Sequence, residues 1–219
     1  MNCFCCFLIF ISLVITELIP DINVSNTDIN IGNAIYDASI KTGFFYINNH
    51  GISTELQQQL LQQTKLFFDL NLGEKLKYQR NTTHWGYTPF GSEILNDNAH
   101  KETKESFYIS LDEHCGNNCA KQSQMPSDSI LPEFREITMK YIKQALNLGF
   151  IMNDYLSLSL GLPKEYFNNI TNCFENPIFV LRLIHYNSEL SNIDTGTFGA
   201  SSHTDYGMLT LLLTDNVPG

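Results

Sequence analysis

The stretch SHTDYGMLTLLLTD, residues 202–215, places a histidine and an aspartate two positions apart, directly before a run of aliphatic residues. The run predicts a strand, and residues i and i+2 of a strand point to the same face of its sheet. His203 and Asp205 would therefore converge, with Thr204 turned away. Such a pair can bind a single metal ion. Ordinary polar residues at the start of a buried strand can have the same spacing.

The chemistry of this pair favours iron. Neither His203 nor Asp205 is a soft sulfur ligand, so Fe(II) suits them better than Cu(I). The facial triad of non-haem iron oxygenases consists of two histidines and one carboxylate, and it leaves further iron positions open. The H-x-D pair supplies two of these three ligands. Because so short a motif often arises by chance, its surroundings decide its meaning.

Three helices are predicted upstream from the spacing of apolar residues. The first covers about 28–42 and ends near Gly43. The second covers 54–70, with Ser53 or Thr54 as its cap. The third is a long helix from about Pro132 to Leu160, which we expect to form a structural spine.

Strands are predicted at 43–51, 104–112 and 177–186, and again from His203 onward. The first reads GFFYINNHG and predicts a buried strand that ends in a turn, where we expect His50 to be a turn or packing residue rather than a ligand. Residues 80–130 otherwise look irregular. Because helices come first and strands later, we expect helices packed on an antiparallel sheet.

Composition limits the function classes. The 219 residues include 43% hydrophobic and 16% charged residues, which is typical of a globular domain. A formal net charge of −10 repels phosphate backbones, so we expect no nucleic-acid partner. No basic run indicates binding to an anionic membrane surface. The oligomeric state stays open.

The whole pattern resembles the 2-oxoglutarate- and Fe(II)-dependent dioxygenases of the isopenicillin N synthase-like superfamily. Seven blocks occur in the order of that family and cover residues 43–219. They are GFFYINNHGIS, FFDLNLGEKLKY, GYTPFGSE, KESFYIS, LSLGLPKEYF, LRLIHYN and HTDYGMLTLLL. Seven ordered blocks are far more specific than the H-x-D motif alone.

The resemblance implies an α+β fold: a distorted double-stranded β-helix, or jelly roll, with N-terminal helices and a long spine helix. It makes His203 and Asp205 metal ligands for Fe(II). It makes Tyr186 a cofactor-binding residue beside 2-oxoglutarate, the co-substrate, or beside the substrate. Many relatives have an asparagine two positions earlier, where this chain has Ile184. The implied reaction is hydroxylation or desaturation of a small organic substrate with O₂.

The resemblance also implies residues that these 219 positions do not contain. The second histidine ligand and an Arg-x-Ser that binds 2-oxoglutarate lie well past the H-x-D motif in the family, whereas this chain stops at Gly219. The other histidines occupy matched segments where the family has no ligand: His50, His84, His100, His114 and His185. We therefore expect a fragment of an oxygenase whose C-terminal strands are missing. The alternative is an inactive truncated remnant that acts as a binding protein.

The apolar start leaves three interpretations open. Residues 4–15 are apolar but short for a membrane span, and no Lys or Arg precedes them. They could be a secretory signal, a first strand or a misassigned gene start. We expect a cytoplasmic protein, with a secreted or tethered binding protein as the alternative.

The expected organisation has four parts. An apolar start covers 1–19, and an N-terminal dioxygenase module covers 20–125. The spine helix and its connection cover 126–176. The incomplete jelly-roll core with the Fe(II) and 2-oxoglutarate site covers 177–219.

Overall fold

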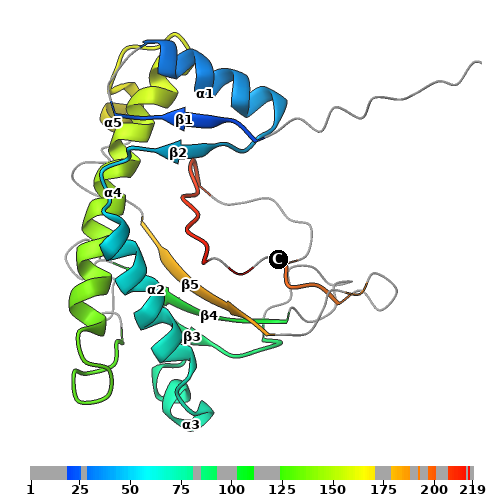
Figure 1. Ribbon diagram of the computed structural model, residues 1–219, viewed down its shortest axis with the longest axis vertical. Coiled ribbons are helices and arrows are strands. Elements are labelled where there is room, and N and C mark those ends of the chain that lie inside the picture. Colours follow the sequence, from blue (N-terminus) through cyan, green and yellow to red (C-terminus); the bar gives the residue numbers. More distant parts are fainter. Residues whose placement is uncertain are drawn as a thin grey trace, which may run out of the picture.

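The computed structural model describes residues 19–25, 29–80, 85–92, 103–110, 124–170, 179–187, 192, 197–200, 207–215 and 217. The second helix and the long spine helix lie on one side of a three-stranded sheet, and the first helix lies beside a two-stranded sheet (Figure 1). The long helix α4 (Phe134–Ser159) runs along much of the molecule. The predicted α+β class, with helices packed on antiparallel strands, is confirmed.

Helix α4 is the spine predicted from the sequence. Its buried residues recur every three or four positions, from Phe134 to Tyr155. It begins after Glu133, which has a left-handed φ of 63°, so the helix excludes Pro132. It ends before Gly161, whose φ of 70° suits a residue without a side chain. None of the helices in the described part of the chain combines the length and apolar character needed to cross a bilayer.

Helices α1 (Ile29–Lys41) and α2 (Thr54–Phe68) lie where the sequence predicts them, and both pack against α4. Ser53 caps α2, because its Oγ accepts a hydrogen bond from the backbone N–H of Leu56 at 3.2 Å. The remaining helices are short: α3 (Leu72–Lys75), the 3₁₀ helix η1 (Leu76–Tyr78) and α5 (Tyr166–Ile170).

The larger sheet separates two environments. Phe107 of this sheet faces the core. Its ring stacks on that of Phe67 of α2, with ring centres 4.4 Å apart, and both rings contact Phe134 of α4. Since residues of a strand alternate between faces, the even-numbered residues lie on the opposite side of the sheet. We call this side the even face; it carries Thr88, Lys104, Ser106, Tyr108, Arg182, Ile184 and Tyr186. The strands are antiparallel in the order β3 (Gly86–Thr88), β4 (Lys104–Ile109) and β5 (Leu181–Tyr186).

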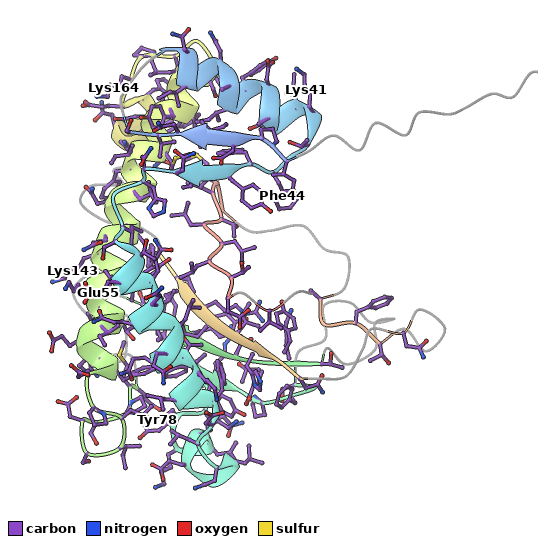
Figure 2. All side chains as sticks on the ribbon, viewed as in Figure 1. Lys41, Phe44, Glu55, Tyr78, Lys143 and Lys164 are labelled. Atoms are coloured by element: carbon purple, nitrogen blue, oxygen red, sulfur yellow. The ribbon has the colours of Figure 1, made fainter. Side chains whose placement is uncertain are left out.

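The smaller sheet corrects one prediction. Its strand β2 (Tyr46–Asn48) pairs in parallel with β1 (Asp21–Asn23) and confirms a strand within 43–51. The prediction that this strand is buried is wrong, since Phe44 and Tyr46 expose 72% and 62% of their surface. The reason is that α1 covers one side of this sheet, while Phe44 lies on the side of β2 away from α1 (Figure 2).

Residues 207–215 differ from the predicted strand after the H-x-D motif. Leu209 and Leu213 pack against the core, whereas Leu212 exposes 78% of its surface. A strand needs a hydrogen-bonded neighbour, and the described sheet ends at β5 on this side. Within the described residues, this run therefore joins no ladder of the named strands.

Candidate functional site

Tyr186, the predicted cofactor-binding residue, is the last residue of β5 and lies on the even face. Its cross-strand neighbour is Lys104, which exposes 6% of its surface. Its ring also contacts Gly199, because a Cβ built on that glycine would lie 2.9 Å from the ring atom Cδ1. Tyr186 itself exposes 49% of its surface. A half-exposed phenol with backbone packed against its ring suits contact with a small polar molecule.

His203 and Asp205 lie outside the described residues, so their convergence stays a prediction. An imidazole nitrogen and a carboxylate oxygen are a donor set that fits Fe(II). The contact of Gly199 with Tyr186 places the chain beside β5 shortly before the H-x-D motif. In the described ranges, no three His, Cys, Asp or Glu side chains gather as a metal site. His50 is a turn residue, as predicted: its Nδ1 accepts a hydrogen bond from the N–H of Ile52 at 3.2 Å.

Arg182 and Tyr108 lie on the even face at the end away from Tyr186. They are cross-strand neighbours, and the Arg182 guanidinium lies 4.8 Å from the centre of the Tyr108 ring. Nε and Nη2 of Arg182 also donate hydrogen bonds to Oγ of Ser106, at 3.2 and 2.9 Å. The guanidinium of Arg80 lies 4.5 Å from the same ring centre. Two positive charges are thus held against one aromatic ring.

Arg80 lies near this ring because its backbone, with that of Tyr78, packs closely against Gly86 of β3. The N–H of Arg80 donates a hydrogen bond to the carbonyl oxygen of Tyr87 at 2.8 Å. Gly86 has a φ of +124°, and a Cβ there would lie 2.5 Å from the carbonyl oxygen of Tyr78. Only glycine allows both this backbone conformation and this close approach.

We expect Gly86→Ala to lower the free energy of unfolding by about 2–3 kcal/mol, because the strained φ and the backbone contact both oppose a side chain. Urea denaturation measures the change. Gly149→Ala is the matched control, since this glycine lies within α4 and its Cβ would meet nothing within 4 Å. Alanine there should stabilise the helix by up to about 1 kcal/mol. Equal effects of the two substitutions would rule out this explanation.

A buried charged cluster, which the sequence analysis did not predict, lies between the sheet and α3. Glu105 of β4 exposes 1% of its surface. Its carboxylate accepts hydrogen bonds from Nζ of Lys75, at 2.8 Å, and from the hydroxyl of Tyr87. Nδ1 of His185 lies 2.8 Å from the other carboxylate oxygen. The sequence could have indicated this cluster, because Glu105 shares a strand face with the apolar Phe107, where a buried carboxylate needs partners.

Tyr87 makes stability sensitive to alkaline pH. Burial raises the pKa of its hydroxyl above the usual value of about 10, and the hydrogen bond to Glu105 raises it further. The folded state therefore holds this proton more tightly than the unfolded chain. This stabilisation is fully present below about pH 10 and is lost progressively as the pH rises toward the folded-state pKa.

We therefore expect the urea midpoint of the wild-type protein to fall between about pH 8 and about pH 11. Tyr87→Phe should show a smaller fall, because it lacks the titrating hydroxyl. Tyr46→Phe changes a tyrosine that is 62% exposed and should keep the full fall. A Tyr87→Phe variant that falls as steeply as Tyr46→Phe would contradict this assignment.

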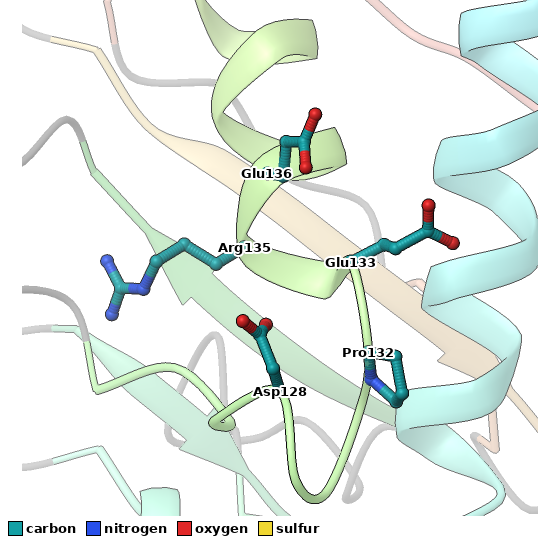
Figure 3. A pocket seen from close by; sticks show the side chains of 5 residues that line it. All are labelled: Asp128, Pro132, Glu133, Arg135 and Glu136. Carbon is teal, nitrogen blue, oxygen red and sulfur yellow. The ribbon is translucent and has the colours of Figure 1, made fainter.

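A surface pocket of about 390 Å³ lies where α4 begins (Figure 3). Its lining residues are Asp128, Pro132, Glu133, Arg135 and Glu136. Three of these side chains are acidic and one is basic. None of them belongs to the three-stranded sheet, so this pocket takes no part in the site around Tyr186.

Comparison with known protein families identifies the N-terminal half of the chain. Residues 19–128 match the family model described as "non-haem dioxygenase in morphine synthesis N-terminal". The matched range is half of the chain and includes α1, α2, β3 and β4.

Curated relatives and a solved structure extend the likeness beyond this range. Kihadalactone A synthase of Citrus sinensis is 28% identical over 205 residues, which cover 90% of this chain and 61% of that protein. A 2-oxoglutarate-Fe(II) type oxidoreductase of Emericella nidulans is 32% identical, covering 81% of this chain and 53% of that protein. A full-length Neurospora crassa protein, solved in complex with alpha-KG, is 25% identical with a TM-score of 0.72. That match covers 86% of this chain and 61% of the other.

This chain is thus shorter than its relatives: it spans 61% of the length of the Citrus protein and 53% of the Emericella protein. It nevertheless shares the fold of the Neurospora protein over 86% of its own length. The family match over half of its length decides the assignment. The chain belongs to the non-haem, 2-oxoglutarate- and Fe(II)-dependent dioxygenases.

Proposed function

We propose that the whole protein is an oxygenase that uses Fe(II), O₂ and 2-oxoglutarate to oxidise a small organic molecule, by hydroxylation or desaturation. The observation that carries this proposal is the His203–Asp205 pair in a chain of this dioxygenase family. The names of relatives support it, since one is a 2-oxoglutarate-Fe(II) type oxidoreductase and another was solved with alpha-KG. The same proposal places the enzyme in the cytoplasm.

His203 and Asp205 hold the iron in this proposal, and Tyr186 lies beside 2-oxoglutarate or the substrate. Bound iron, together with 2-oxoglutarate and O₂, supplies the oxidising power needed to break a C–H bond. The chain's own residues position the reactants and keep water away. Two observations support this role: the backbone of Gly199 packs against the Tyr186 ring, and Tyr186 pairs with Lys104 across the strands.

Binding of 2-oxoglutarate to the 219-residue chain, measured by calorimetry with Fe(II) and without O₂, tests this role of Tyr186. Tyr186→Ala should weaken the affinity about tenfold or more, because a hydrogen bond to a charged group contributes about 1.5–3 kcal/mol. Tyr46→Ala removes another exposed tyrosine, on β2, and should bind as the wild type does. Equal binding by the Tyr186→Ala and Tyr46→Ala variants would contradict this role of Tyr186.

A further inference from the structure

The even face carries a second concentration of polar groups, near the start of β5. Arg80 and Arg182 flank the ring of Tyr108, at 4.5 and 4.8 Å from its centre. Arg182 also donates two hydrogen bonds to Oγ of Ser106. Thr88 of β3 lies directly opposite Ser106 in the strand register, so both side chains share this face. We call Arg80, Thr88, Ser106 and Arg182 the arginine–hydroxyl group.

Thr88 supplies the observation that points to a ligand. It exposes 8% of its surface, and its Oγ1 has no hydrogen-bond partner in the described structure. Ser106 exposes 1% of its surface, and its Oγ accepts both hydrogen bonds from Arg182, which leaves its hydroxyl proton to donate. A buried hydroxyl without a partner is unfavourable, and buried polar groups in proteins are nearly always paired. A bound acceptor would satisfy both hydroxyls.

The local charge selects the kind of acceptor. The chain as a whole has a net charge of −10, yet two guanidiniums lie on one aromatic ring at this place. The Tyr108 ring and the Ser106 hydroxyl orient the Arg182 fork, so less conformational freedom is lost on binding. A guanidinium attracts a carboxylate by its charge and its N–H donors, and each hydroxyl adds one donor. A carboxylate fits this donor set.

We propose that the arginine–hydroxyl group binds a carboxylate of the organic substrate, so that the enzyme oxidises an organic acid. This inference rests on the proposed function, because it places the substrate on the same face as Tyr186. Arg182 and Tyr186 are four residues apart in β5, which corresponds to roughly 13 Å at about 3.3 Å per residue. The acid group is therefore held at a distance from Tyr186, and the oxidised carbon is remote from the carboxylate.

Octanoate and octanamide are suitable probes, because they differ in charge but little in shape. Each is titrated into the 219-residue chain without iron or 2-oxoglutarate, and binding is followed by calorimetry. The fluorescence of Trp85, the one tryptophan of the sequence, reports locally because Trp85 directly precedes β3. Octanoate should bind at least about tenfold more tightly than octanamide. Equal affinities would overturn the proposal.

Two variants separate binding from a structural role. Arg182→Gln should weaken octanoate binding about tenfold or more. Lys143→Gln removes the positive charge of an exposed residue of α4 and should leave octanoate binding unchanged. Thr88→Val removes a hydroxyl that lacks a partner, so it should weaken octanoate binding while keeping or raising the melting temperature. Thr88→Val with unchanged affinity, or Arg182→Gln with the affinity of Lys143→Gln, would contradict the proposed subsite.

The two proposals fail separately. His203→Ala should leave octanoate binding unchanged, because the assay contains no iron. Failure of iron binding with normal octanoate binding would contradict the iron site of His203 and Asp205 and leave the subsite intact. Since 2-oxoglutarate also carries carboxylates, it is added as a competitor. Weak competition is expected, whereas displacement of octanoate at equal concentrations would assign the subsite to the co-substrate and overturn the inference.

Discussion

Glu105→Ala is expected to lower the free energy of unfolding by about 3–5 kcal/mol. Its carboxylate is buried and is the ionic partner of Lys75, whose side chain is 9% exposed. Alanine leaves that ammonium without its counter-charge, and it also removes the acceptor for the Tyr87 hydroxyl. Removing one partner of a buried pair is costly, because the remaining charge stays desolvated. Urea denaturation at neutral pH measures the loss.

The double variant Lys75→Met with Glu105→Leu is the matched control. It removes both charges and replaces them with apolar side chains of similar size, which is often neutral or stabilising. Most of the stability lost in Glu105→Ala should therefore return. If the double variant is as unstable as Glu105→Ala, the loss comes from packing or from the other partners of the carboxylate. In that case the uncompensated Lys75 charge is not the cause.

Phe67→Ala is expected to cost about 3–5 kcal/mol, the range typical of deleting a fully buried aromatic ring. Phe67 exposes 0% of its surface and joins α2 to both the sheet and α4. The rings it contacts are Phe68, Tyr78, Tyr87, Phe107 and Phe134. The structure therefore loses both burial and aromatic packing at the centre of its core.

Phe44→Ala removes the same side chain from a residue that is 72% exposed, so it should change stability by less than about 0.5 kcal/mol. Chemical denaturation of both variants gives the comparison. A loss below about 1 kcal/mol for Phe67→Ala would mean that this ring cluster is not the core that joins α2, α4 and the sheet.

The helices could be predicted from the sequence because their signals are local. Apolar residues at spacings of three and four mark the buried side of α4, from Phe134 to Tyr155. The hydroxyl of Ser53 marks the start of α2 and makes the expected hydrogen bond. Neither signal depends on residues distant in the chain.

Features that depend on distant neighbours were harder to predict. Phe44 and Tyr46 look like a buried strand, but burial depends on a second covering layer that local sequence does not reveal. The three-residue strand β3 lies in a stretch that looks irregular, because pairing with β4 defines it. The partners of Glu105 come from positions 18, 30 and 80 residues away. Only its place on an apolar strand face could have indicated them.

Only those residues of the candidate site that lie in a recognisable sequence motif could be predicted. Tyr186 was predicted because the chain resembles the dioxygenase family, and it lies at the end of β5 on the even face. The arginine–hydroxyl group was not found, because Thr88 and Arg182 come together through strand register alone. His203 and Asp205 stay predictions, since they lie outside the described residues.

Anaerobic titration of Fe(II) into the purified 219-residue chain tests most directly whether His203 and Asp205 hold iron. Saturable binding of one Fe(II) is expected, and His203→Ala and Asp205→Ala should each weaken it by at least about tenfold. His50→Ala is the control, because His50 makes a turn contact with Ile52 and should not affect the metal. The iron site on which the proposed oxygenase rests would be contradicted if both ligand variants bound Fe(II) as the wild type does. It would also be contradicted if the wild type bound no more Fe(II) than these variants.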